Sequence, residues 1–251
     1  MNTEALTNLL FRLADDKLIL GHRNSEWIGI GPILEEDIAF ASMAQDEVGH
    51  AQVYYQLLGD LGEADPDTLA FTRKEEEFLC CQLVEYPIGD YAFSLMRHYL
   101  YDMADMVRLA HLKNSNYRPL AELAKKLSRE EKYHQLHART FVRQLATANE
   151  EARGKLQEAL TELWPIAFGI FEPTVHTQTL ANEGIQPHED RLMKEWRVEC
   201  SGFLGECGLQ IPASENFVDH FGGRSGHHTL YLAPLLKEMT EVFAIDPLAK
   251  W

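Results

Sequence analysis

Two stretches of the sequence decide the fold: Gln45-Asp46-Glu47-Val48-Gly49-His50 and Arg129-Glu130-Glu131-Lys132-Tyr133-His134. Each contains Glu-x-x-His, and each has a second acid directly before the glutamate. On a helix, residues three apart lie on one face about one turn from each other, so the carboxylate and the imidazole point at the same place. Two such pairs on facing helices, joined by one carboxylate from each of two further helices, form the di-iron or di-manganese site of a four-helix bundle.

Apolar residues recur every three or four positions around both stretches, which predicts amphipathic helices. No strand alternation of any length interrupts this pattern. The expected long helices cover residues 3–23, 35–61, 90–112 and 119–148, with a short crossing helix at 68–84 and further helices at about 150–171, 188–208 and 228–243. The sequence therefore predicts an all-α protein, a ferritin-like four-helix bundle with additional C-terminal helices. We expect a single domain over 1–251, with a bundle core at about 3–148 and the helices of about 149–251 packed on it.

Composition limits the partners and the compartment. The 251 residues carry 39 acids and 23 bases, a formal net charge of −16, which argues against binding to nucleic acid or to an anionic membrane surface. No apolar run approaches the roughly 18 residues that a membrane helix needs. No signal peptide is visible, and the four cysteines show no Cys-x-x-Cys or zinc spacing. These features predict a cytoplasmic protein with reduced thiols.

The apolar stripes place six polar side chains inward at one level of the bundle. Ionised groups are almost never fully buried unless they are paired or bound to metal. Carboxylate and imidazole ligands suit iron or manganese. Asp46 and Glu130 are the expected hydrogen-bond acceptors for the imidazole N–H groups. The six inward residues are Lys17, Glu47, His50, Asp102, Glu131 and His134.

Lys17 occupies the position where a sixth ligand is required. It precedes Glu47 by about as many residues as Asp102 precedes Glu131, and we expect its ammonium to lie among Glu47, Asp102 and Glu131. Three acids and one lysine leave a net charge of −2, which one divalent ion or raised carboxylate pKa values could neutralise. A buried Glu-His pair can also be a hydrogen-bonded core pair, and that alternative stays open. Our hypothesis is a degenerate centre with zero or one metal ion, iron being the candidate, rather than two.

Further stretches carry a family resemblance over nearly the whole chain. They are Asp16–Arg23, Ser25-Glu26-Trp27, Leu34–Ala39, Gln45–Gln52, Leu69–Arg73, Leu83–Asp90 with Pro87 and Gly89, and Gly222–Thr229. With these motifs the chain resembles the phenylacetate-degradation oxygenase subunits, and it is most similar to their C type. Positions 47, 50, 102, 131 and 134 match the ligand pattern of the catalytic A type, whereas position 17 has Lys in place of Glu.

The resemblance implies a structural, non-catalytic subunit of the multicomponent monooxygenase that epoxidises phenylacetyl-CoA. Its expected partners are a catalytic paralogue of the A type that holds the di-iron centre, further subunits of the complex, and a reductase that uses NADPH. A homodimer is a further expectation for the isolated chain. Because five of six ligand types remain, the alternative is that the chain is itself a carboxylate-bridged oxygenase or oxidase.

Two other features of the sequence bear on function. The loop Gly222–His228 is locally basic in an acidic chain and is either a contact for a CoA phosphate or partner, or simply a turn near a helix start. The adjacent Cys80 and Cys81 cannot form an ordinary disulfide without strain, so we expect them to be packing residues.

Overall fold

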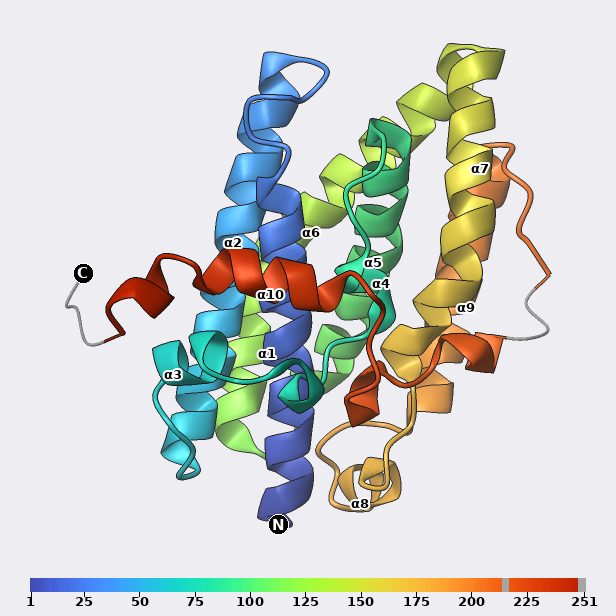
Figure 1. Cartoon of the computed structure of the whole chain (residues 1–251). Helices are drawn as coiled ribbons and strands as arrows, with labels where there is room; N and C mark the ends of the chain where they lie inside the picture. The colour runs from blue at the N-terminus through green and yellow to red at the C-terminus, as the bar shows by residue number, and fades with distance from the viewer. Residues whose placement is uncertain (214–216, 248–251) are drawn as a thin grey trace.

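Four long helices form the body of the protein in the computed structural model, which describes residues 1–213 and 217–247. The helices are α1 (Thr3–Ser25), α2 (Leu34–Asp60), α5 (Tyr91–Leu112) and α6 (Arg118–Ala148). Helix α1 packs mainly against α2, and α5 packs mainly against α6 (Figure 1). The described residues contain no strand, which confirms the all-α class. None of their helices is long and apolar enough to cross a membrane.

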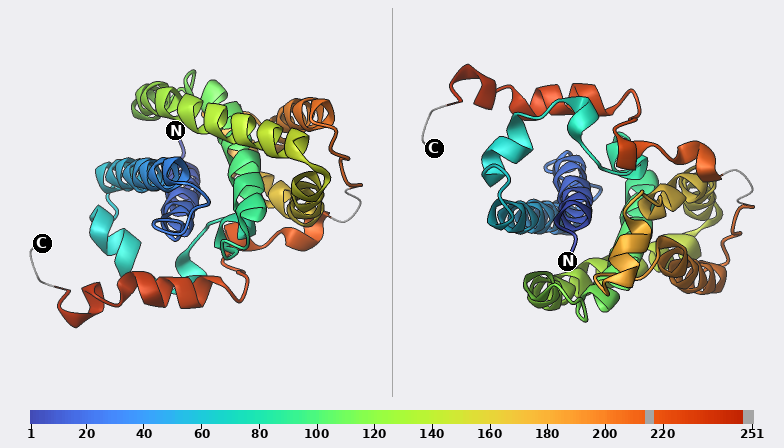
Figure 2. Two further views of the ribbon diagram at one scale, coloured as in Figure 1. Left: turned by 90° about the horizontal axis from the view of Figure 1, so that it is seen from above. Right: turned by 90° about the horizontal axis from the view of Figure 1, so that it is seen from below.

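The remaining elements surround this bundle on two sides. Helices α7 and α9 pack on α5, whereas α10 contacts α3 and η1 and runs outside the α1–α2 pair without packing on it (Figures 1 and 2). The bounds are α3 (Pro66–Phe71), α4 (Gln82–Glu85), α7 (Glu150–Ala167), α8 (Thr177–Asn182), α9 (Glu189–Glu206) and α10 (Leu232–Thr240). Single 3₁₀ turns are η1 (Glu75–Glu77), η2 (Phe168–Phe171), η3 (Phe217–His220), η4 (Gly223–Ser225) and η5 (Phe243–Ile245).

Local sequence fixes where several helices begin. The side chains of Asn2, Asp90 and Asn149 accept hydrogen bonds from backbone N–H groups of the first turns of α1, α5 and α7. Such caps satisfy donors that have no partner within the helix. Helix α6 instead has a proline in its first turn, where the missing N–H costs nothing. The four long helices accordingly match their predicted ranges to within two residues.

The predicted crossing helix at 68–84 is wrong. The chain forms α3, η1 and α4, and residues 78–81 between them are not helical. Asp15 accepts a hydrogen bond from the backbone N–H of Leu79 at 2.7 Å, and Asp16 accepts one from the backbone N–H of Cys81 at 2.8 Å. These carboxylates of α1 take the donors that a continuous helix would use, so tertiary contacts override the local pattern. The structure also contains α8, which the sequence pattern did not predict, and α9 and α10 are shorter than expected.

A buried ion cluster attaches α9 to the bundle. Glu189 at the start of α9 accepts hydrogen bonds from Arg108 on α5, the shortest 2.9 Å, and from Arg12 on α1 at 3.1 Å. All three side chains are almost fully buried. Burial alone would raise the pKa of Glu189, but the two guanidinium groups lower it to about 2. The carboxylate is therefore ionised and bridges three helices.

We predict that Glu189→Gln lowers the free energy of unfolding by about 3–5 kcal/mol, because it leaves two guanidinium groups buried without their counter-charge. Urea denaturation followed by circular dichroism measures this effect. The matched control is Glu122→Gln, which breaks an exposed pair with Lys125 and should leave stability unchanged within error. Equal stability of the two variants would show that the Glu189 cluster does not hold α9 in place.

Candidate metal centre

The six polar residues predicted to face inward all do so. Lys17 comes from α1, Glu47 and His50 from α2, Asp102 from α5, and Glu131 and His134 from α6, and each is at most 2% exposed. Each of these residues lies within the apolar face of its helix, and that face packs toward the core, so the polar side chains point inward as well. The four long helices thus deliver one connected polar group to the middle of an apolar bundle.

The Lys17 ammonium lies among three carboxylates. Its Nζ is 2.5 Å from Glu131 Oε1 and 2.8 Å from Glu47 Oε2. The third partner is Asp105, with 2.8 Å between Nζ and Oδ2, so the expectation that Asp102 would be the third partner is wrong. Asp105 lies on α5 about one turn beyond Asp102, at the level that the ammonium reaches. Burial would lower the Lys17 pKa, but the three carboxylates raise it well above its usual value, so the ammonium stays charged.

Asp102 lies beside His98 instead, without a hydrogen bond between the two side chains. Its Oδ2 is 3.1 Å from Nε2 of His98, one turn earlier on α5, and both side chains are fully buried. Burial raises the pKa of Asp102 well above its usual range and lowers that of His98 well below its usual range. Burial thus disfavours the charged form of both side chains. His98 is not among the six inward residues predicted from the sequence, and the structure adds it to the buried polar group.

The acid before each Glu-x-x-His glutamate holds the imidazole of the opposite helix. His50 Nε2 donates to Glu130 Oε2 at 2.7 Å, and His134 Nε2 donates to Asp46 Oδ2 at 3.2 Å. This confirms the predicted acceptors and adds that they act across the α2–α6 pair. In each histidine the other nitrogen faces the centre: His134 Nδ1 is 3.4 Å from Glu47 Oε1, and His50 Nδ1 is 3.4 Å from a Glu131 oxygen. Burial opposes the charged form of His134, but its carboxylate neighbours raise its pKa to about 11.

The arrangement fits one metal ion. Glu47, Asp102, Glu131 and His134 each offer a ligand atom, and these four atoms lie within 4.8 Å of one another. Both oxygens of Asp102, Glu131 Oε2 and His134 Nδ1 are buried without a hydrogen-bond partner, as expected of atoms aimed at a cation. His50 does not belong to this set. Glu47 and Glu131 of this set also contact the Lys17 ammonium, so a second ion shared between these glutamates would lie close to that positive charge, which would repel it.

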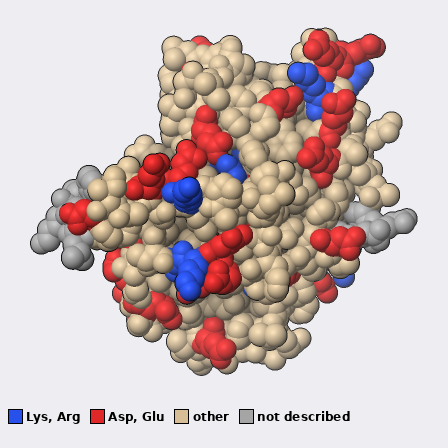
Figure 3. All heavy atoms as spheres, viewed as in Figure 1, with Lys and Arg blue, Asp and Glu red and all other residues tan. Residues whose placement is uncertain are grey.

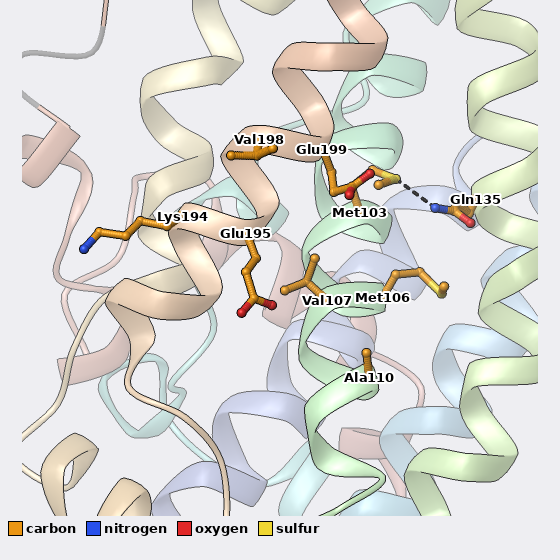
Figure 4. A pocket seen from close by; sticks show the side chains of 9 residues that line it. All are labelled: Met103, Met106, Val107, Ala110, Gln135, Lys194, Glu195, Val198 and Glu199. Atoms are coloured by element: carbon orange, nitrogen blue, oxygen red, sulfur yellow. Dashed lines mark hydrogen bonds between the residues drawn. The ribbon is translucent and has the colours of Figure 1, made fainter.

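An apolar groove lies on the surface between α5, α6 and α9, outside this centre. Its volume is about 580 Å³. The side chains of Met103 and Met106 point toward α6, and Gln135 of α6 donates to the Met103 sulfur (Figure 4). The other lining residues are Val107, Ala110, Lys194, Glu195, Val198 and Glu199. None of the nine lining residues belongs to the buried polar group.

The loop Gly222–His228 has an internal role. Arg224 is buried, and its guanidinium donates to both oxygens of Asp16 at 2.7 and 2.8 Å and to the carbonyl of Leu79 at 2.9 Å. Since its guanidinium faces α1, Arg224 is not available to a CoA phosphate at the surface, and the loop contains the expected turn as η4. Sequence periodicity missed this pair and Asp105, because both depend on contacts between distant segments.

Comparison with known proteins confirms the resemblance seen in the sequence. The chain matches the phenylacetic acid catabolic protein family over residues 1–251. It is 32% identical to the C-type subunit of the 1,2-phenylacetyl-CoA epoxidase of Escherichia coli (strain K12) over 247 residues, which cover 98% of this chain and 99% of that relative. It is 27% identical to the A-type subunit of the same enzyme over 147 residues, or 59% of this chain and 47% of that relative. Because the family match spans the whole chain, this protein belongs to the phenylacetic acid catabolic protein family.

Proposed function

We propose that the chain is a structural subunit of a multicomponent monooxygenase that epoxidises phenylacetyl-CoA. End-to-end similarity to a C-type subunit supports this role, and weaker similarity to an A-type subunit supports a paralogue of the same fold as its partner. In this proposal the A-type paralogue carries out the oxygen chemistry and a reductase supplies its electrons. We place the complex in the cytoplasm, which agrees with the four free cysteines of the chain.

The observation that carries the structural role is the Lys17 ammonium. It contacts both Glu47 and Glu131, the glutamates of the two Glu-x-x-His pairs, which would be among the ligands of a di-metal centre. The ammonium is covalently part of the chain and supplies one positive charge. A di-metal centre would supply four positive charges, but its two divalent ions can dissociate. The polar group can therefore hold four helices together without taking part in a reaction.

A second candidate is an oxidase or oxygenase with a single iron in the set of Glu47, Asp102, Glu131 and His134. The unpartnered buried atoms of that set favour it. Iron bound there would supply oxygen activation. The chain itself would hold the ion, exclude water by burial, and orient the His134 ring through Asp46.

We predict that Lys17→Glu increases the number of iron ions bound per chain, because it removes the repelling ammonium and restores the missing carboxylate. Iron content is measured by plasma mass spectrometry after anaerobic loading with Fe²⁺ and gel filtration. Lys17→Met is the matched control, since it removes the charge but adds no ligand, and it should bind less iron than Lys17→Glu. Circular dichroism confirms that both variants are folded. If Lys17→Glu binds no more iron than the parent, then the lysine is not what limits metal binding, and the prediction is contradicted.

We propose the α1–α2 connection as the surface that contacts the partner. Five aliphatic side chains within eleven residues are at least half exposed there, and contiguous exposed apolar side chains mark interaction sites. In Figure 3 the surface over this connection, at the upper left, is largely uncharged. The five residues, which we call the isoleucine cluster, are Ile28, Ile30, Ile33, Leu34 and Ile38.

We predict that the double change Ile30→Asp with Ile38→Asp reduces co-purification with the A-type paralogue of the same organism at least tenfold, because each aspartate would be desolvated at the interface. Affinity capture from cells that co-express both chains measures this. Val175→Asp, at a position that is 91% exposed outside the cluster, should leave capture unchanged. Capture of the double variant at full strength would rule out the isoleucine cluster as the contact.

A further inference from the structure

A second group of metal-ligating side chains lies between the segment 78–85 and the loop 222–229. Cys80, Glu85 and His228 offer one ligand atom each, and these atoms lie within 4.8 Å of one another. Cys80 is fully buried, and so are the side chains of Glu85 and His228. Cys80 lies just before α4, Glu85 is the last residue of α4, and His228 follows η4. Only the folded chain brings these three residues together.

The three donor atoms have nearly the spacing of one face of a zinc tetrahedron. Cys80 Sγ is 3.7 Å from Glu85 Oε1 and 3.9 Å from His228 Nδ1, and the last two atoms are 2.7 Å apart. With zinc–sulfur bonds of about 2.3 Å and zinc–nitrogen or zinc–oxygen bonds of about 2.0–2.1 Å, these three separations would be about 3.5, 3.5 and 3.3 Å. Opening the His228–Glu85 contact by about 0.6 Å, the difference between the tetrahedral and observed separations, therefore makes room for the ion.

The surrounding backbone already orients the ligands as a metal site requires. His228 Nε2 donates to the carbonyl of Phe78 at 2.9 Å, which leaves Nδ1 facing Cys80 and Glu85. The second oxygen of Glu85 accepts from the N–H of Thr229 at 2.7 Å, which leaves Oε1 facing the same point. A ligating histidine commonly donates its other N–H to a backbone carbonyl in this way.

Close packing of the loop 222–229 against the segment that precedes α4 keeps the three ligands together. Gly223 lies against the carbonyl of Cys80 so tightly that a Cβ could not fit, and Gly226 lies in the same way against the carbonyl of Glu76. Gly226 also has a φ of 78°, which disfavours any side chain. The loop therefore cannot move away from residues 76–81 without losing these contacts.

We propose that Cys80, Glu85 and His228 bind a zinc ion that fastens the C-terminal loop to the bundle. Binding releases the thiol proton of Cys80 and the Nδ1 proton that His228 shares with Glu85. A divalent ion with one thiolate, one carboxylate and one neutral imidazole has no net charge, which suits a buried position. The set includes a thiolate, which favours zinc over iron or manganese. The site is separate from the Lys17 centre and does not depend on the proposed function.

Co²⁺ is the probe that separates the two centres, because only a cobalt–thiolate bond gives a charge-transfer band in the near ultraviolet. The full chain is stripped with a chelator, dialysed and titrated with Co²⁺ and then with Zn²⁺. We expect the band to saturate at one cobalt per chain and to disappear when zinc is added. The melting temperature should rise with Zn²⁺, as ligands of the native state stabilise it. Absence of the band from the folded parent chain would overturn the proposal and leave only a hydrogen-bonded trio.

Three variants test the assignment of the ligands. Cys80→Ser should abolish the band, and His228→Asn should weaken cobalt binding at least tenfold. Cys200→Ser is the matched control, because it changes another buried thiol outside the group and should keep the band. Circular dichroism establishes that each variant is folded. A band that survives Cys80→Ser in a folded chain would assign the thiolate to another cysteine and contradict the proposal.

Discussion

The ammonium group of Lys17 pairs with carboxylates from three other helices at the centre of this protein. Lys17 is 1% exposed, and its charge is balanced by carboxylates from α2, α5 and α6. Breaking a buried ion pair by removing one partner leaves an uncompensated charge and costs several kcal/mol. All four long helices must therefore stay in register for this charge to remain paired. The lysine takes the structural role of a metal ion, because it connects the same helices through the same carboxylates.

Helix α1 extends this principle to its other face. Asp15 accepts hydrogen bonds from Tyr55, Arg73 and Leu79, and Asp16 is paired with Arg224. The two neighbouring acids and Lys17 thus point in different directions from one turn of α1. Through Lys17 the helix is joined to the other three long helices. Through the two acids it is joined to the non-helical residues 78–81 and to the loop 222–229. This explains why nearly the whole middle of α1 is buried despite its charged residues.

Periodicity predicted the parts of the structure that depend on one helix at a time. The stripes located the four long helices and turned Glu47, Asp102 and Glu131 inward, because a position on a stripe determines its direction. Periodicity could not show whether Asp102 or Asp105 contacts Lys17, since both are on the inner side of α5. The choice depends on the position of α1 relative to α5 along the bundle axis. It also missed the break at residues 78–81, where the decisive groups, Asp15 and Asp16, are more than sixty residues away.

Diffraction at the iron absorption edge tests most directly whether the Lys17 ammonium excludes a second metal ion. Crystals of the parent chain grown with Fe²⁺ under anaerobic conditions would be measured on both sides of the edge. We expect at most one anomalous peak, on the side of Asp102 and His134, with Lys17 Nζ still in contact with Glu47 and Glu131. Two peaks flanking these glutamates, with the lysine side chain displaced, would contradict the exclusion.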